Sequence, residues 1–141
     1  MAYHARTFDI AASVAAKADR GRRSYHSGCA AEEQVCAQYQ RTGYSLLASR
    51  WRAGRGELDL VFAAPEYVAE DIVVVEVKSA RDFDTALSRI TPAKARRLFT
   101  TTEQFLDTQP KGSLTDCRID VAAVNQGGAI EIHENFFAGG I

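Results

Sequence analysis

The stretch Ile72-Val73-Val74-Val75-Glu76-Val77-Lys78 is the most apolar part of the 141-residue chain, yet it contains two charged side chains. β-Branched residues favour strands, and a strand with few polar positions is typical of the centre of a sheet. Burying Glu76 and Lys78 there is costly unless each charge is paired or bound to a metal. The stretch therefore predicts a central strand with either a structural salt bridge or a functional site, and its setting favours the site.

The rest of the chain divides into helical and extended segments around this strand. The predicted elements are a helix from near Ser27 to Gly43, strands at Tyr44–Arg52 and Glu57–Phe62, the strand at Ile72–Lys78, a helix opened by Thr91-Pro92, and strands at Cys117–Val124 and Ala129–His133 joined by a hairpin. The order α-β-β-β-α-β-β predicts an α/β domain with a mixed central sheet flanked by helices.

Length and composition set the class of protein. A chain of 141 residues with 46% hydrophobic residues is enough for one core, and we expect a domain at 27–137 after a partly mobile basic extension at 1–26. The net charge of −1 counts against a nucleic-acid binder, although clustered carboxylates at a metal site would lower the total charge of such a protein.

Cellular location is inferred from cysteines and hydropathy. The cysteines Cys29, Cys36 and Cys117 are odd in number and form no C-x-x-C pair, so neither a disulfide framework nor a zinc site is indicated. No apolar run approaches the roughly 20 residues that cross a membrane. We expect a soluble protein of a reducing cytoplasm, with no membrane partner.

Two pairs of charged residues on successive strands form the candidate site. Residues two apart in a strand point to the same face, so Glu57 and Asp59 are expected to share one face, as are Glu76 and Lys78. The short connection between the strands makes them neighbours, and side chains opposite each other in a sheet lie about 5 Å apart. Glu57, Asp59 and Glu76 are therefore predicted metal ligands.

Hydrolysis of a phosphodiester explains this set of residue types. Asp59 and Glu76 can hold Mg²⁺ or Mn²⁺, a metal that polarises a phosphate and lowers the pKa of bound water. Lys78 can orient or activate the attacking water and offset charge in the transition state. Glu32, on the inward stripe of the first predicted helix, is either paired or functional.

Basic and aromatic residues near the predicted site have two interpretations. Arg50, Arg52, Arg55 and Lys94 would contact phosphates of DNA, and Arg89, Arg96 and Arg97 around the second predicted helix are further candidates. All of them can equally be solvated surface residues, and the sequence leaves both interpretations open. Trp51 is more often a core residue than a base-stacking one. The pattern around Asp120 favours a buried structural partner over a catalyst.

Six short motifs occur together in a recognisable order. They are Ala31-Glu32, Gly43-Tyr44, Arg50-Trp51-Arg52, Gly56-Glu57-Leu58-Asp59-Leu60, Val75-Glu76-Val77-Lys78 and Arg118-Ile119-Asp120-Val121. Over roughly Ser27 to Asn135 they resemble the YraN-like family of small bacterial proteins. That family is placed by similarity in the PD-(D/E)xK nuclease superfamily, near the archaeal Holliday-junction resolvases.

The resemblance implies a restriction-endonuclease-like core, a divalent metal and DNA as the substrate. Asp59 would match the metal-binding aspartate, Glu76 and Lys78 the (D/E)xK pair, and Glu32 the acid of the first helix. Glu57 matches the family's own glutamate, while Leu58 replaces the superfamily's proline. The resemblance also suggests a homodimer.

Three hypotheses follow from these observations. The first is a metal-dependent endonuclease in which Lys78, Asp59, Glu76 and Glu32 are catalytic. The second is a nucleic-acid-binding module on the same fold that does not cut. The third is an interaction protein in which Glu76 and Lys78 form a structural ion pair.

Overall fold

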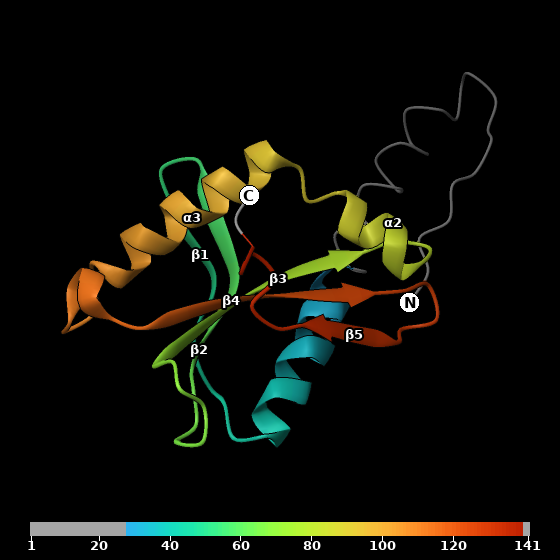
Figure 1. Cartoon of the computed structure of the whole chain (residues 1–141). Coiled ribbons are helices and arrows are strands. Elements are labelled where there is room, and N and C mark those ends of the chain that lie inside the picture. Colours follow the sequence, from blue (N-terminus) through green and yellow to red (C-terminus); the bar gives the residue numbers. More distant parts are fainter. Residues whose placement is uncertain (1–27, 140–141) are drawn as a thin grey trace, which may run out of the picture.

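The computed structural model describes residues 28–139, which form a five-stranded sheet with helices on both faces (Figure 1). Its elements are a first helix at 28–41, β1 (Ser45–Ala53), β2 (Gly56–Ala63), β3 (Ile72–Ser79), α2 (Phe83–Ser88), α3 (Pro92–Leu106), a 3-10 turn η1 (Gly112–Leu114), β4 (Cys117–Val124) and β5 (Ile130–His133). The predicted α/β class and element order are confirmed, with the short α2 and η1 added. The predicted extension at 1–26 lies outside the described residues.

The apolar strand predicted at Ile72–Lys78 is β3, the middle strand of the sheet. The strand order is β1-β2-β3-β4-β5, and β3 pairs antiparallel with β2 and parallel with β4. Val73, Val74 and Val75 have no exposed surface. The parallel pair needs a crossover, which α2 and α3 provide between β3 and β4. The mixed sheet and its buried central strand are thus confirmed.

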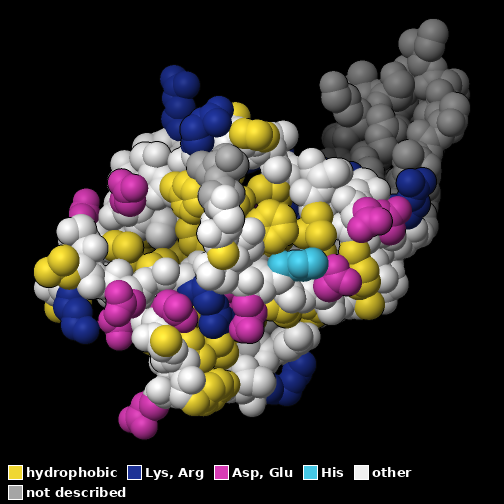
Figure 2. Space-filling view, viewed as in Figure 1, with side chains coloured by type: hydrophobic (Ala, Val, Ile, Leu, Met, Phe, Trp, Pro, Cys, Tyr) yellow, Lys and Arg dark blue, Asp and Glu magenta, His cyan; other side chains and the backbone are white. Residues whose placement is uncertain are grey.

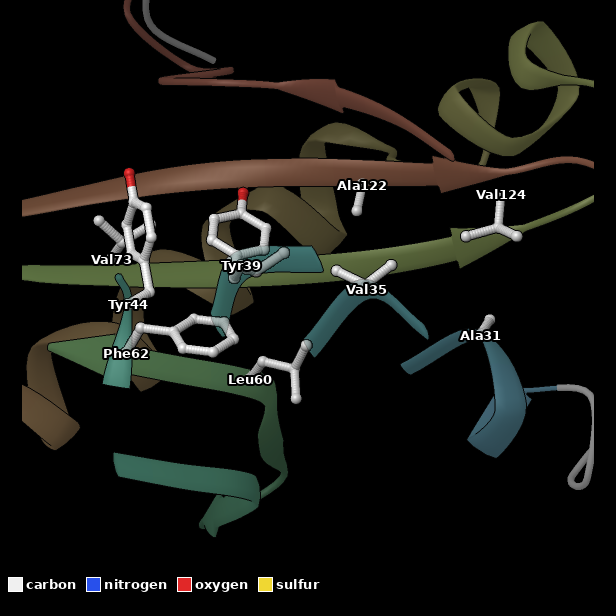
Figure 3. Close-up of a cluster of buried hydrophobic side chains, with 10 residues drawn as sticks. Ala31, Val35, Tyr39, Tyr44, Leu60, Phe62, Val73, Ala122 and Val124 are labelled. Carbon is white, nitrogen blue, oxygen red and sulfur yellow. The ribbon is translucent and has the colours of Figure 1, made fainter. Parts of the chain in front are cut away.

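The first helix covers one face of the sheet. Ala31, Val35 and Tyr39 recur every four residues and are all buried, as expected for the inward stripe of a helix. Figure 3 shows these side chains against residues of the central strands, and the ring of Tyr39 stacks on that of Phe62 with centroids 4.9 Å apart. Gly43, at φ +95°, takes the left-handed conformation that ends the helix.

The other face is covered by α3. Its start agrees with the prediction, because the Thr91 side chain accepts a hydrogen bond from the N–H of Lys94 and Pro92 is the first helical residue. Leu98, Phe105 and Leu106 pack on this face with Leu58, Val61, Ile72 and Val74. Trp51 meets Phe105 edge to face at 5.1 Å, so its predicted place in the core is confirmed.

Asp120 is held inside the domain by four hydrogen bonds. Its fully buried carboxylate accepts one from the Tyr39 hydroxyl at 2.7 Å, two from the Arg118 guanidinium and one from the N–H of Asn135. These contacts join β4, the first helix and the segment after β5. The structural role predicted for Asp120 is confirmed. Between residues 28 and 139, no helix is long and apolar enough to cross a membrane.

Candidate active site between β2 and β3

The β2–β3 ladder ends before it reaches the charged residues. Its last pair is Leu60 with Val75, and beyond that point the side chain of Asp59 continues the contact, because its Oδ2 accepts a 2.8 Å hydrogen bond from the backbone N–H of Val77. A carboxylate thus takes the place of a strand carbonyl. The arrangement directs Asp59 across the gap between the strands, towards Glu76 and Lys78.

The uninterrupted alternation expected along Glu57–Phe62 is wrong at Asp59. Leu58 belongs to the core beneath α3 and Leu60 to the core beneath the first helix, although they are two residues apart. On β1, Arg50 lies between Ser49 and Trp51, the partners of Leu60 and Leu58, and has φ +50°. Glu57 Oε2 accepts a 2.8 Å hydrogen bond from Arg52 Nε. The shared face expected for Glu57 and Asp59 stays a prediction.

Glu76 and Lys78 lie together on the α3 side of the sheet. They follow Ile72 and Val74, which pack in the core beneath α3, in the two-residue alternation of β3. Lys78 Nζ is 3.1 Å from Glu76 Oε2, so the predicted ion pair exists. The other oxygen, Glu76 Oε1, is buried and has no hydrogen-bond partner. An unpaired buried acceptor costs about 1–3 kcal/mol, and more when it is charged.

The proximity of these groups changes the pKa of Asp59. Burial, and after it the negative charge of Glu76, raise the pKa of Asp59 from 3.8 to about 8, although the hydrogen bond from the Val77 N–H lowers it. Two neighbouring carboxyl groups in a half-buried site disfavour double ionisation. A bound cation would remove that conflict, which makes the pair a functional-site candidate.

The donor set fits Mg²⁺ or Mn²⁺ held by two carboxylates. Mg²⁺ is often bound through one or two carboxylates, with water and substrate phosphate completing its shell. Asp59 and Glu76 supply such a pair, and the unpartnered Glu76 Oε1 supplies a buried acceptor for a cation. No group of three or more His, Cys, Asp or Glu side chains within 28–139 is arranged to hold a metal. The part predicted for Glu57 on the metal stays a prediction.

Glu32 approaches the site from the first helix and is held by Arg50. The guanidinium donates from Nε to Oε1 at 3.0 Å and from Nη2 to Oε2 at 3.3 Å. Burial raises the pKa of Glu32, the hydrogen bond from Arg50 lowers it, and the charge of Asp59 raises it. Glu32 is therefore paired and also within the electrostatic reach of Asp59. Arg50 was not predicted as its partner, because the positive φ of Arg50 has no signal in the sequence.

A cavity of about 390 Å³ lies between the first helix and β1, on the Glu32 side of the sheet. Arg50 lines it, and its Nη2 donates a 3.0 Å hydrogen bond to Cys29 Sγ. The lining residues are Cys29, Glu32, Glu33, Cys36, Gln40, Leu46, Ser49, Arg50 and Leu60.

The four predicted phosphate contacts fall into two groups. Arg50 and Arg52 are paired with Glu32 and Glu57, respectively. Arg55 and Lys94 are exposed, and the described part of the chain offers neither an acidic partner. Their contact with DNA stays a prediction.

The chain matches a family model and curated relatives over most of its length. The model of the uncharacterised protein family UPF0102 matches residues 31–124, a range that contains every acidic residue of the candidate site. A UPF0102 protein of Roseobacter denitrificans is 43% identical over 89% of this chain and 94% of its own length. Those of Ruegeria pomeroyi and Dinoroseobacter shibae are 41% and 33% identical, over 89% and 92% of this chain and 98% and 93% of their own lengths. The resemblance to the YraN-like group is thereby confirmed, and the chain belongs to the uncharacterised protein family UPF0102.

Proposed function

We propose that this protein is a divalent-metal-dependent endonuclease that hydrolyses phosphodiester bonds in DNA, with branched or structured DNA among its substrates. The observation that carries the proposal is the carboxyl pair at the end of the β2–β3 ladder. Glu76 presents a buried oxygen without a partner, and Asp59, beside it, has a raised pKa. Without a cation, Asp59 must keep a proton and share a hydrogen bond with Glu76, whereas a bound cation would allow both carboxylates to be charged.

Asp59 and Glu76 would hold the metal. Bound there, Mg²⁺ or Mn²⁺ would polarise the scissile phosphate and lower the pKa of a coordinated water. The hydrogen bond from the Val77 N–H fixes the Asp59 carboxylate before any ligand arrives, so little reorganisation is needed on binding.

Lys78 would act at the same phosphate. Its ammonium group lies 3.1 Å from Glu76 and is itself mostly buried, with 23% of its side chain exposed. An ammonium group in such a position donates hydrogen bonds to an attacking water and to a phosphate oxygen that gains charge. Glu32 would contribute a further acid from the first helix, where Arg50 holds its carboxylate and the charge of Asp59 raises its pKa.

A non-cutting DNA-binding module is the second candidate. It is favoured by the 3.1 Å Glu76–Lys78 ion pair, which neutralises one carboxylate without a metal, and by the lack of a third ligand within 28–139. The two functions share a partner and differ in whether the phosphodiester bond is broken, so one assay separates them.

The assay incubates the purified protein with branched, single-stranded and duplex DNA in Mg²⁺, Mn²⁺ or EDTA. We expect cleavage in either metal and none in EDTA. Asp59→Asn, Glu76→Gln and Lys78→Met should each lower the rate about 100-fold or more, the scale of losing one stabilising group in a transition state. Glu103→Gln, an exposed change of charge on α3, serves as the matched control and should cut normally.

Cleavage that persists in Asp59→Asn or Lys78→Met would refute these roles. Binding without cleavage in every metal would favour the non-cutting module. Neither binding nor cleavage would favour the structural interaction protein. Thermal unfolding of each variant establishes that a lost activity does not reflect a lost fold.

A further inference from the structure

Four basic side chains are exposed on or beside the N-terminal half of α3. These residues, which we name the basic ridge, are Arg55, Lys94, Arg96 and Arg97. Among residues 28–139 none of the four has an acidic partner, whereas Arg52, Arg81 and Lys111 each do. Figure 2 shows Lys and Arg side chains projecting at the top of the view, where the β1–β2 turn and α3 lie in Figure 1.

The β1–β2 turn is packed against α3, and this contact makes the ridge continuous. A Cβ on Gly56 would lie 1.7 Å from Thr101 Oγ1, so the backbone of the turn touches the helix. The hydroxyl of Thr101 donates in turn to the carbonyl of Arg97 at 2.9 Å. Arg55, next to Gly56, therefore lies beside the helical turn that carries Arg97.

The ridge lies on the same side of the sheet as the candidate active site. Leu98, the residue after Arg97, packs on Ile72 and Val74, and those two positions share a face of β3 with Glu76 and Lys78. The connection to the site is made by Arg89, which precedes α3 and donates a 2.8 Å hydrogen bond to the carbonyl of Ser79, the residue after Lys78. Positive charge thus extends from the end of β3 along α3.

The opposite side of the sheet has a different charge pattern. The cavity beside the first helix is lined by Glu32 and Glu33, and Arg50 within it is paired with Glu32. A polyanion approaching from that side would meet carboxylates at the surface. With a net charge of −1 for the whole chain, only a local concentration of unpaired cations attracts a polyanion, and the ridge is such a concentration.

We infer that the basic ridge binds the phosphate backbone of DNA and leads it to Asp59, Glu76 and Lys78 from the α3 side of the sheet. This inference rests on the proposed function. It adds the side of the sheet from which DNA reaches the site and the residues that bind its phosphates. Three of the four residues are arginines, whose planar guanidinium matches two phosphate oxygens at once. Of the four phosphate contacts expected from the sequence, Arg55 and Lys94 belong to the ridge. Arg50 and Arg52 instead form ion pairs with Glu32 and Glu57, respectively.

The test measures DNA affinity against salt in EDTA, where metal-dependent cleavage cannot interfere. Arg96→Ala/Arg97→Ala is compared with Arg41→Ala/Lys111→Ala, which removes the same charge from exposed positions outside the ridge. Fluorescence anisotropy with a labelled duplex, from low to moderate salt, gives the slope of log affinity against log salt. Loss of two phosphate contacts should reduce that slope by about 1.8, and the control should keep it. Arg96→Lys/Arg97→Lys, which retains the charges, should keep most of the slope.

If Arg96→Ala/Arg97→Ala and Arg41→Ala/Lys111→Ala weaken DNA binding equally, the inference about the basic ridge is wrong, because only the total charge of the protein would matter. An unchanged slope in Arg96→Ala/Arg97→Ala would contradict the inference as well. Metal-dependent cleavage, measured in parallel on the same variants, separates the two claims. If the wild type cleaves DNA and Arg96→Ala/Arg97→Ala keeps the wild-type salt slope, only the inference about the basic ridge is refuted. If the wild type neither binds nor cleaves DNA, both the proposed function and the inference about the ridge are refuted.

Discussion

The backbone N–H of Val77 donates a 2.8 Å hydrogen bond to Oδ2 of Asp59, at the point where the β2–β3 ladder has already ended. The side chain therefore replaces main-chain pairing in the middle of the sheet. It also brings an acid against Glu76 in a half-buried position, where burial and the neighbouring charge both oppose ionisation. The same contact that completes the fold thus creates the electrostatic conflict of the candidate site.

Asp59 should make the metal-free protein less stable as the pH rises. Its pKa is about 8 in the folded state against 3.8 as the reference value, so between these values the folded state holds a proton that the unfolded state has released. The contribution of Asp59 to the stability of the folded state is fully present below pH 3.8 and is lost as the pH rises through 8. Each unit of difference between the two pKa values corresponds to at most about 1.4 kcal/mol of unfolding free energy. Asp59→Asn removes this dependence and keeps an acceptor for Val77.

Urea unfolding in EDTA at pH 5, 7 and 9 measures the effect. The difference in unfolding free energy between Asp59→Asn and wild type should grow in favour of the variant as the pH increases. A difference that stays constant from pH 5 to 9 would show that Asp59 has the same pKa in both states.

Gly56→Ala should destabilise the domain by roughly 1–3 kcal/mol, the scale of overpacking in a core. Its new Cβ would lie 1.7 Å from Thr101 Oγ1 and 2.9 Å from Thr101 Cβ, so the β1–β2 turn must move away from α3. Gly127→Ala is the matched control, since the nearest atom to its Cβ would be at an ordinary 3.6 Å. Denaturant midpoints measure both changes.

Thr101→Ala provides a second check, because it removes the closest atom and leaves the contact with Cβ. In the Gly56→Ala background it should therefore restore part of the lost stability. If Gly56→Ala and Gly127→Ala have the same midpoint, the turn does not pack on α3 as described.

Much of the fold could be predicted because local chemistry and tertiary context agree. The β-branched residues of Ile72–Lys78 favour a strand, and the core around them needs one; Thr91-Pro92 opens a helix by the same cap that the structure contains. The helix α2 was missed because six residues carry too little periodicity, although Asp82, which accepts from the N–H of Thr85, was a readable cap.

The geometry of the candidate site was harder to predict than its residues. The sequence pointed to the Glu76–Lys78 pair and to Asp59, and the structure places them at one end of a ladder. It could not show that the alternation fails at Asp59, next to which Arg50 on the neighbouring strand has a positive φ. Such a backbone state is set by tertiary contacts, since arginine has no preference for it.

Asp120→Ala should cost about 3–5 kcal/mol, because it leaves the buried Arg118 guanidinium without its main counter-charge. Arg118 has 10% of its side chain exposed and donates two hydrogen bonds to Asp120. Asp116→Ala, an exposed acid four residues earlier, should change stability by less than about 0.5 kcal/mol. Thermal and urea unfolding of both variants compare the two sites, and a similar small effect at each would contradict the network.

Divalent metal should stabilise the folded protein through Asp59 and Glu76, independently of any cleavage. A ligand that binds only the folded state raises its stability by RT ln(1 + [L]/Kd), about 1.4 kcal/mol when the metal concentration is ten times its Kd. Differential scanning fluorimetry in Mg²⁺, Mn²⁺ or EDTA at constant ionic strength should show a higher Tm with metal for the wild type and for Glu103→Gln. Asp59→Asn and Glu76→Gln should each abolish the shift. An equal shift in all four proteins would place the metal elsewhere, whereas a shift lost only at Asp59 and Glu76 would assign these two carboxylates as the ligands.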